Sequence, residues 1–181
     1  MYPAPEIAKD TVLRARLGDA SAFRTIVEGL SRLTFNIAYR MVYNATDAED
    51  LTQEVFLRLH RNLDKYDPSY PFMPWFRTLA SHVCINWRKQ QPKAASLDAM
   101  EVDPAGAQAE EPRDPSALLK REIDKLPPEY KMVLSYLYFE GLSVADISAA
   151  MNVPTGTVKT WLFRAREHLK EKLKPHVATL L

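Results

Sequence analysis

The sequence is poor in the side chains that most enzymes and metal proteins use, with one cysteine and four histidines. Cys84 alone cannot form an internal disulfide, and a site of several thiolates is excluded. The histidines, His60, His82, His168 and His176, fall on separate predicted elements without ligand spacing. No nucleophile–base pattern and no phosphate-binding glycine loop is present. We therefore expect a protein that is not an enzyme and that needs no cofactor or metal.

Long apolar runs are also lacking. No stretch approaches the roughly 18 apolar residues of a membrane-spanning helix, and Met1 to Leu17 lack the pattern of a signal peptide. A cytoplasmic protein is the resulting expectation. At 181 residues, 46% hydrophobic and 26% charged, the chain can build one large or two small cores, and we expect two small domains. Its net charge is only +1, so any surface for nucleic acid must be local.

A helix-turn-helix is predicted from Leu142 to Lys174. Ser143 followed three residues later by Asp146 is a capping-box start, and an apolar stripe follows it. Pro154 cannot continue that first helix, and Gly156 is expected to allow close backbone approach where the second begins. These signals place a short helix and a longer one on either side of a tight joint.

The second of these helices concentrates positive charge. From Asn152 to Lys174 there are six Lys/Arg and two Glu, while Val158, Leu162 and Leu169 belong to an inward apolar stripe. Residues in the first turns of a recognition helix meet base edges, and later basic residues meet phosphates. An ordinary solvated face on a three-helix core is the alternative. The expected duplex contacts are Thr155, Thr157, Lys159, Thr160, Phe163, Arg164 and Arg166.

An acidic face with one apolar residue is predicted on an earlier helix, which should start at Thr46 with Glu49 completing a capping box. Its core stripe is expected at spacing four. The opposite face carries Asp50, Gln53, Glu54 and Leu57, with no basic residue between positions 41 and 57. Acids near a helix start complement its dipole, but the dipole does not account for Leu57. A docking face for a basic helix accounts for both.

The segment Tyr66 to Phe76 holds five aromatics and three prolines in eleven residues, which predicts a stiff aromatic loop. Pro74 should open the next helix. One face of that helix carries Trp75, Thr78, His82, Asn86 and Lys89, and no acid occurs between positions 77 and 93. Aromatic and basic residues together suit single-stranded nucleic acid. The alternative is that Phe72 and Trp75 pack the loop onto the core.

These elements predict an all-α fold of two small helical domains, 1–91 and 116–181, joined by a flexible acidic linker at 92–115. Further helices are expected from Phe23 to Met41, from Ser116 to Lys125 and from Glu129 to Phe139. Fully extended, the linker would span roughly 80 Å, enough to reach DNA sites two helical turns apart.

Two stretches, 47–90 and 126–173, resemble regions two and four of the extracytoplasmic-function sigma factors of bacterial RNA polymerase, group 4 of the sigma-70 family. The first reads DAEDLTQEVFLRLHRNL and continues to FRTLASHVCINWRKQ; the second contains LSVADISAAMNVPTGTVKTWLFRAREHL. The resemblance implies a transcription initiation factor whose partners are core polymerase, through the β′ clamp helices and the β flap, promoter DNA and an anti-sigma factor. It further implies a stress or environmental signal, and the anti-sigma factor could hold the protein at the membrane.

The resemblance also assigns the surfaces. The acidic face, Asp50, Gln53, Glu54 and Leu57, would dock on the clamp, and the basic helix would read the distal promoter element. The aromatic loop would border a pocket for a flipped base of the proximal element. The implied proximal-element residues are Tyr66, Ser69, Tyr70, Phe72, Trp75, His82, Asn86, Arg88 and Lys89.

Two residues depart from the family pattern. His82 stands where many members have Asn, which is expected to alter base preference, and Trp161 stands at an often basic position. Two other functions are left open: a sigma-like decoy that binds an anti-sigma factor but not DNA, and a stand-alone helix-turn-helix regulator. The second would leave the acidic face and the aromatic loop without a use.

Overall fold

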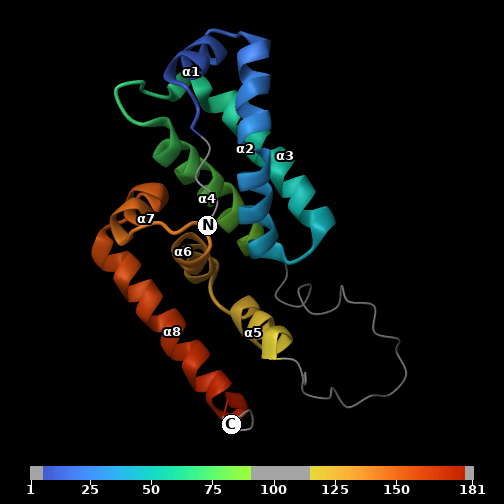
Figure 1. Cartoon of the computed structure of the whole chain (residues 1–181), viewed down its shortest axis with the longest axis vertical. Coiled ribbons are helices and arrows are strands. Elements are labelled where there is room, and N and C mark those ends of the chain that lie inside the picture. Colours follow the sequence, from blue (N-terminus) through green and yellow to red (C-terminus); the bar gives the residue numbers. More distant parts are fainter. Residues whose placement is uncertain (1–5, 91–114, 178–181) are drawn as a thin grey trace.

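The computed structural model describes residues 6–90 and 115–177, and all regular secondary structure in these ranges is helical (Figure 1). The predicted all-α class is therefore confirmed. None of the described helices is long and apolar enough to cross a membrane. The elements are α1 (Lys9–Arg16), α2 (Ala20–Val42), α3 (Ala45–Asn62), the 3-10 turn η1 (Leu63–Lys65), α4 (Phe72–Gln90), α5 (Pro115–Asp124), α6 (Pro128–Tyr138), α7 (Val144–Met151) and α8 (Thr155–Val177).

Helices α1 to α4 form the N-terminal unit. Apolar residues three or four positions apart on α2 and α3, among them Ile26, Leu30, Leu51 and Val55, are fully buried between the helices. On α4, Phe76 and its neighbours at the same spacing close the core from the other side. This packing fixes the surfaces that α3 and α4 present to solvent.

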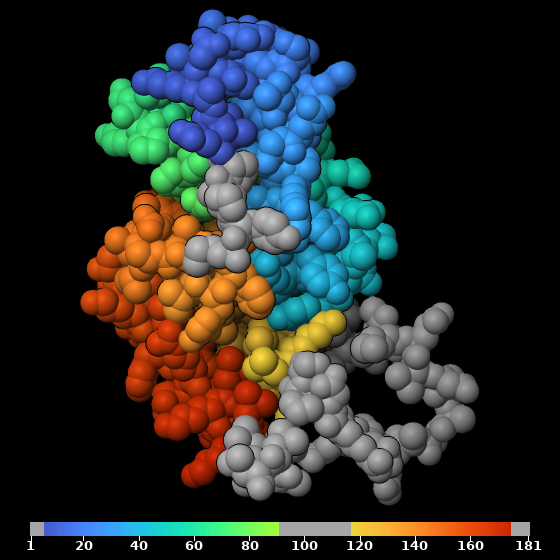
Figure 2. Space-filling model, viewed as in Figure 1, coloured from blue at the N-terminus to red at the C-terminus, as the bar shows by residue number. Residues whose placement is uncertain are grey.

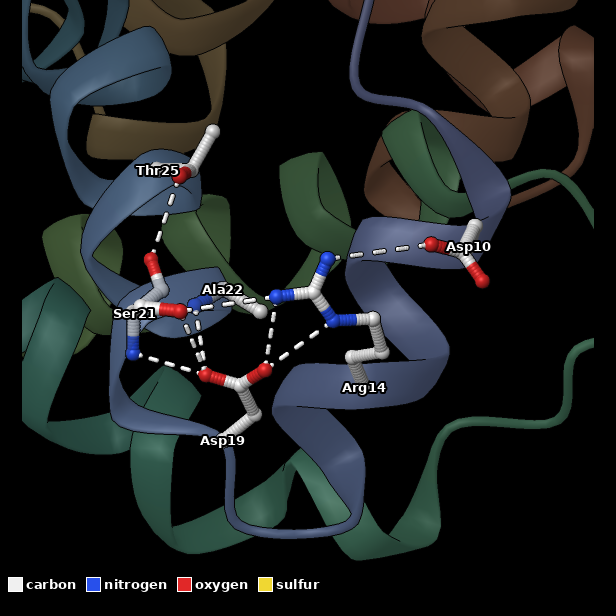
Figure 3. A network of polar contacts seen from close by, with 6 residues as sticks. All are labelled: Asp10, Arg14, Asp19, Ser21, Ala22 and Thr25. Atoms are coloured by element: carbon white, nitrogen blue, oxygen red, sulfur yellow. Dashed lines mark hydrogen bonds and ion pairs between the residues drawn. The ribbon is translucent and has the colours of Figure 1, made fainter.

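The turn between α1 and α2 is held by Arg14 and Asp19 (Figure 3). Asp19 caps α2, since one carboxylate oxygen accepts from the backbone nitrogens of Ser21 at 2.9 Å and Ala22 at 3.0 Å. The other oxygen accepts from Arg14 Nη2 at 2.7 Å. The hydrogen bonds from Ser21, Ala22 and Arg14 hold the pKa of Asp19 well below its usual range. Gly18 has φ 94°, a conformation that favours glycine.

Helices α5 to α8 form the C-terminal unit, in which α6 and α7 pack on α8. The two units are in contact: α7 and α6 pack against α4, and α6 also packs against α2. Figure 2 shows the two halves meeting without a gap at the orange and green segments. Met132, Tyr136 and Ile147 of the C-terminal unit belong to one hydrophobic core with Phe76 of α4. The predicted linker, 92–115, lies outside the described residues except for Pro115.

Three local predictions were wrong. Helix α3 begins at Ala45, because the side chain of Asn44 accepts a hydrogen bond from Asp47 N and so caps it before Thr46. Helix α4 begins two residues before Pro74, which is tolerated because the first-turn N–H groups have no intrahelical acceptor. A Cβ on Gly156 would meet nothing within 4 Å, so close packing does not require that glycine.

Candidate nucleic-acid interface

The acidic face predicted on α3 lies on the outside of the helix. Asp50 and Gln53 are exposed, Glu54 is half-buried, and Leu57 keeps 51% of its surface accessible. Beneath them, Leu51 and Val55 are fully buried. Asp50, Glu54 and Leu57 thus follow one another at intervals of about one turn on the outside of α3. The exposed apolar side chain of Leu57 lies on the same face as the two carboxylates. Such a surface suits a helix with apolar and basic residues.

The aromatic loop is ordered by its own side chains. Asp67 accepts a hydrogen bond from Ser69 N at 2.9 Å, which lowers the pKa of its carboxyl. The hydroxyl of Tyr66 donates to the carbonyl oxygen of Tyr70 at 2.5 Å. Burial raises the pKa of the Tyr66 hydroxyl. Tyr66 and Phe72 are only 3% and 7% exposed. The loop residues that a ligand can reach therefore include Ser69 and Tyr70, and Tyr70 is 68% exposed.

Trp75 connects the loop to a surface pocket. Its ring centroid lies 5.1 Å from that of Tyr66 and 5.9 Å from that of Phe72, and the residue is half-buried. Packing on the core and a part-exposed aromatic surface are thus combined in one side chain. Phe72 is buried, which agrees with the alternative interpretation that it packs the loop onto the core.

An open pocket of about 400 Å³ lies between the end of α3 and the outer face of α4. It collects Trp75, His82 and Asn86, three of the predicted proximal-element residues, and none of its lining side chains is acidic. Cations, amides and an indole in one cavity can pair with a phosphate, form hydrogen bonds to a base edge and stack on a base. The lining residues are Arg58, Asn62, Lys65, Trp75, Thr78, Leu79, His82, Val83 and Asn86.

The α3 side of this pocket was missed in the sequence. Lys65 Nζ donates to Asn62 Oδ1 at 3.0 Å, and Asn62 Nδ2 donates to the carbonyl of Arg58 at 2.7 Å. These three residues line the same pocket as His82. The sequence did contain a signal for this side of the pocket, because basic residues occur from the position after Leu57 up to the start of the aromatic loop.

The helix-turn-helix forms as predicted. Ser143 and Asp146 make the reciprocal capping box, and hydrogen bonds from Ser143 lower the pKa of Asp146. Asn152 ends α7 in the left-handed conformation at φ 53°, and Ser148 Oγ donates to Val153 O at 2.5 Å. These contacts fix the joint that α8 follows.

The outer face of α8 is available to a ligand. The expected duplex contacts Thr155, Lys159, Thr160, Phe163, Arg164 and Arg166 are exposed, Phe163 at 64%, while Thr157 is half-buried. Thr160 Oγ1 donates to Gly156 O at 2.9 Å, which orients the side chain along the helix. Arg166 Nε donates to the hydroxyl of Tyr138 on α6 at 3.0 Å. Trp161 packs on Tyr130, with ring centroids 6.4 Å apart.

Two predicted proximal-element cations are already paired within the chain. Arg88 Nη2 lies 3.1 Å from both carboxylate oxygens of Asp124, and Lys89 Nζ lies 2.5 Å from Glu129 Oε1. Asp124 also pairs with Lys131, whose side chain is 1% exposed. Burial lowers the pKa of Lys131 to about 8, although Asp124 acts in the opposite direction. Asp124, Glu129 and Lys131, the residues that take part in these pairs besides Arg88 and Lys89, all belong to the C-terminal unit.

Comparison with known proteins assigns both units to one family. Residues 26–93 match the model for sigma-70 region 2, and residues 116–169 match the model for sigma-70 region 4. The chain is 31% identical to the ECF RNA polymerase sigma factor SigW of Bacillus subtilis over 180 residues, which covers 92% of this chain and 96% of that protein. It is 29% identical to the ECF RNA polymerase sigma-E factor of Escherichia coli K12 over 178 residues, covering 91% and 93%.

Solved structures agree on the fold. The chain matches CnrH, solved in complex with the cytosolic domain of CnrY, with a TM-score of 0.69 at 20% identity, covering 94% of this chain and 99% of that one. It matches the sigma factor RpoE of Bartonella quintana, solved with the anti-sigma factor NepR, with a TM-score of 0.58 at 20% identity, covering 84% and 96%. The two family regions, the near full-length relatives and the shared fold show that this chain belongs to the ECF sigma factors of RNA polymerase.

Proposed function

We propose that the chain brings core RNA polymerase to promoters with two recognition elements and helps to open them, with the work divided between its units. The observation that supports this most directly is the presence, on one chain, of an acidic face on α3, a pocket between α3 and α4 that is lined by two basic residues, and an exposed face on α8. A stand-alone regulator would need only the last of these. The proposed units are residues 1–91, which hold region two, and 116–181, which hold region four.

The acidic face of α3 is the proposed contact with the β′ clamp helices of the polymerase, while region four would contact the β flap. Asp50, Gln53 and Glu54 would meet basic or polar groups, and Leu57 would enter an apolar recess between them. Interfaces of this kind gain most from a few well-buried apolar anchors, with charges that set orientation and rate. This proposal gives a reason for the exposure of the apolar Leu57, which the helix dipole does not explain.

The pocket between α3 and α4 is the proposed site for an unstacked base of the proximal element. Trp75 would stack on the base, while His82, Asn86 and Asn62 would meet its edge. Arg58 and Lys65 would hold the adjoining phosphates. Extrusion of a base costs a few kcal/mol, which stacking of about 1–3 kcal/mol and the polar contacts would offset.

The outer face of α8 is the proposed reader of the distal element in duplex form. Lys159, Thr160 and Phe163 lie early in the helix, where a recognition helix meets base edges. Arg164 and Arg166 follow, where phosphates are nearer. The exposed Phe163 would then contact an apolar edge such as a thymine methyl group.

Regulation by an anti-sigma factor, which would release the protein upon a stress or environmental signal, is also proposed. It is supported by the two structural relatives, one solved with an anti-sigma factor and one with a cytosolic domain of another protein. The protein would act in the cytoplasm, as a binding factor and not as an enzyme, and an anti-sigma factor could hold it at the membrane until the signal arrives.

The docking assignment is tested with Asp50→Arg combined with Glu54→Arg. Co-elution with core polymerase should be lost or weakened at least tenfold in affinity, while circular dichroism and thermal unfolding stay unchanged. Glu6→Arg with Glu28→Arg is the matched control, because it makes the same charge change at two exposed acids that do not belong to α3. Undiminished co-elution of the α3 variant would remove the docking face from the account.

A further inference from the structure

The end of α6 contacts the outer side of α8 through an exposed pair of side chains. Tyr138 is the last residue of α6, and Arg166 lies on α8. Arg166 Nε donates to the hydroxyl oxygen of Tyr138 at 3.0 Å, and the guanidinium carbon lies 5.6 Å from the centroid of that ring. Tyr138 nevertheless remains 61% exposed, and Arg166 is exposed as well. The pair therefore joins the helix-turn-helix to the preceding helix at the surface of the protein.

The contact uses only one edge of the Arg166 guanidinium. This group has five N–H donors in a planar fork, and Tyr138 accepts the one on Nε. Among the described residues, none of the ion pairs includes Arg166. The N–H groups on Nη1 and Nη2 thus remain for a ligand, and two parallel N–H donors match two oxygens of a phosphate.

Arg166 lies on the same side of α8 as two other proposed DNA contacts. Lys159, Phe163 and Arg166 follow one another at spacings of four and three, so they share one face of the helix, and all three are exposed. The proposed function places Lys159 and Phe163 at base edges and Arg166 at the adjoining backbone. Through its contact with Arg166, Tyr138 also reaches this interface, although it precedes the helix-turn-helix.

Stability does not require the contact between Tyr138 and Arg166. Helix α6 packs on α8 through a buried apolar core to which Met132, Tyr136, Val158 and Leu162 contribute. A hydrogen bond between exposed side chains adds little to such packing. An arginine side chain, in contrast, loses much rotamer freedom when it is immobilised, and fixing it before a ligand binds lowers that cost of binding.

We propose that Tyr138 is a positioning residue for the distal promoter element. It holds Arg166 by Nε so that the Nη1 and Nη2 groups meet one phosphate of the duplex. The inference rests on the proposed function of α8 and extends it to a residue of α6. Because the ligand is a backbone phosphate, the contact fixes the register of α8 on the duplex and carries no base preference of its own.

The test uses holoenzymes assembled from core polymerase and either the wild type, Tyr138→Phe or Arg166→Ala. Each is bound to promoter duplexes in which single phosphates of the distal element are replaced by neutral methylphosphonates. The quantity measured is the ratio of affinities for the native and the neutralised duplex, in which differences in holoenzyme assembly cancel. Neutralisation at one position should weaken the wild type roughly tenfold, because a charge-assisted contact is lost. Arg166→Ala should abolish this loss, and Tyr138→Phe should reduce it to about threefold at the same position.

Two controls separate positioning from other roles. Tyr130→Phe removes a hydroxyl from another α6 tyrosine that packs on α8, with its ring centroid 6.4 Å from that of Trp161, and it should keep the tenfold loss. Tyr138→Phe added to Arg166→Ala should cause no further change, since a positioning residue acts only through the group that it holds. The urea midpoint of Tyr138→Phe should match that of the wild type.

Three results would overturn the role of Tyr138. These are an undiminished tenfold loss in Tyr138→Phe, a lowered urea midpoint together with that undiminished loss, and a further fall in affinity when Tyr138→Phe is added to Arg166→Ala. The second would make the pair a structural link between α6 and α8, and the third would make Tyr138 a DNA contact in its own right. A wild-type holoenzyme that is insensitive to every phosphate of the distal element would instead refute the proposed function of α8, on which the inference rests.

Discussion

The buried ammonium of Lys131 makes the stability of this protein depend on pH in a way that can be calculated. The side chain is 1% exposed and contacts Asp124, with the Tyr43 ring centroid 5.7 Å from Nζ. Its pKa falls from 10.5 to about 8 because burial outweighs the attraction of Asp124. The fold therefore favours the neutral amine more than the unfolded chain does.

The sign and the size follow from linkage. Below pH 8 both states hold the proton, and the native state bears the full cost of the buried charge, about 3 kcal/mol for a shift of that size. Between pH 8 and 10.5 the unfolded state binds more protons than the native state, so stability rises with pH. Between pH 7 and 9.5 the expected gain from Lys131 is about 2 kcal/mol.

The assay is urea unfolding of the wild type and of Lys131→Met at half-unit steps across that range, with midpoints compared at constant slope. Methionine keeps the length of the side chain without the charge, and Asp124 keeps its contacts with Arg88. The stability of the wild type relative to the variant should rise by about 2 kcal/mol from pH 7 to 9.5. Lys170→Met, at a 76% exposed side chain, is the control and should track the wild type. Parallel curves for wild type and Lys131→Met would refute the reasoning.

Three further predictions concern the reading surfaces and the joint that presents them. Arg164→Ala should weaken duplex binding about equally across sequences and lower the slope of log affinity against log salt by about one, as measured by fluorescence anisotropy; a loss confined to one base pair would contradict a phosphate contact. His82→Asn should change base preference at one position of the melted element, and an unaltered profile in a base-substitution series would make His82 structural. Ser143→Ala should cost about 1 kcal/mol in urea unfolding, since it removes the cap of α7, and an unchanged midpoint would show that the cap does not stabilise the native state.

Local signals in the sequence predicted most of the helices. The capping box at Ser143 and the apolar stripe through Val158 and Leu162 need only residues three or four apart, and both are present in the structure. The exposed Leu57 was likewise predictable from the face it shares with two acids. Such features depend on helical periodicity, which the sequence displays directly.

What was missed depends on partners distant in the chain or on competing local options. Helix α1 buries only Val12 and Ala15, too few for a periodic pattern, and it is held to α2 by Arg14 and Asp19. Asn44 and Thr46 are both acceptable helix caps, and propensity alone does not choose between them. Helical periodicity and intrinsic propensity therefore do not decide either outcome.

The contact between the two units was the feature that the sequence predicted least well. Arg40 and Glu140 are 100 positions apart, and Arg88 and Asp124 are separated by 36. A basic residue on α4 looks the same in sequence whether it meets DNA or a carboxylate of the same chain. Only the fold shows that Arg88 and Lys89, which were predicted to contact the proximal element, have carboxylate partners in the same chain.

The measurement that tests the sigma function most directly is start-site-mapped transcription from fragmented genomic DNA, using core polymerase with and without this protein. We predict defined new starts, each preceded by the same two-part motif, and their loss with the Asp50→Arg, Glu54→Arg variant. No new starts from a folded protein that binds polymerase would contradict the account and favour a decoy. Binding to duplex DNA without binding to polymerase would replace the account with a stand-alone regulator.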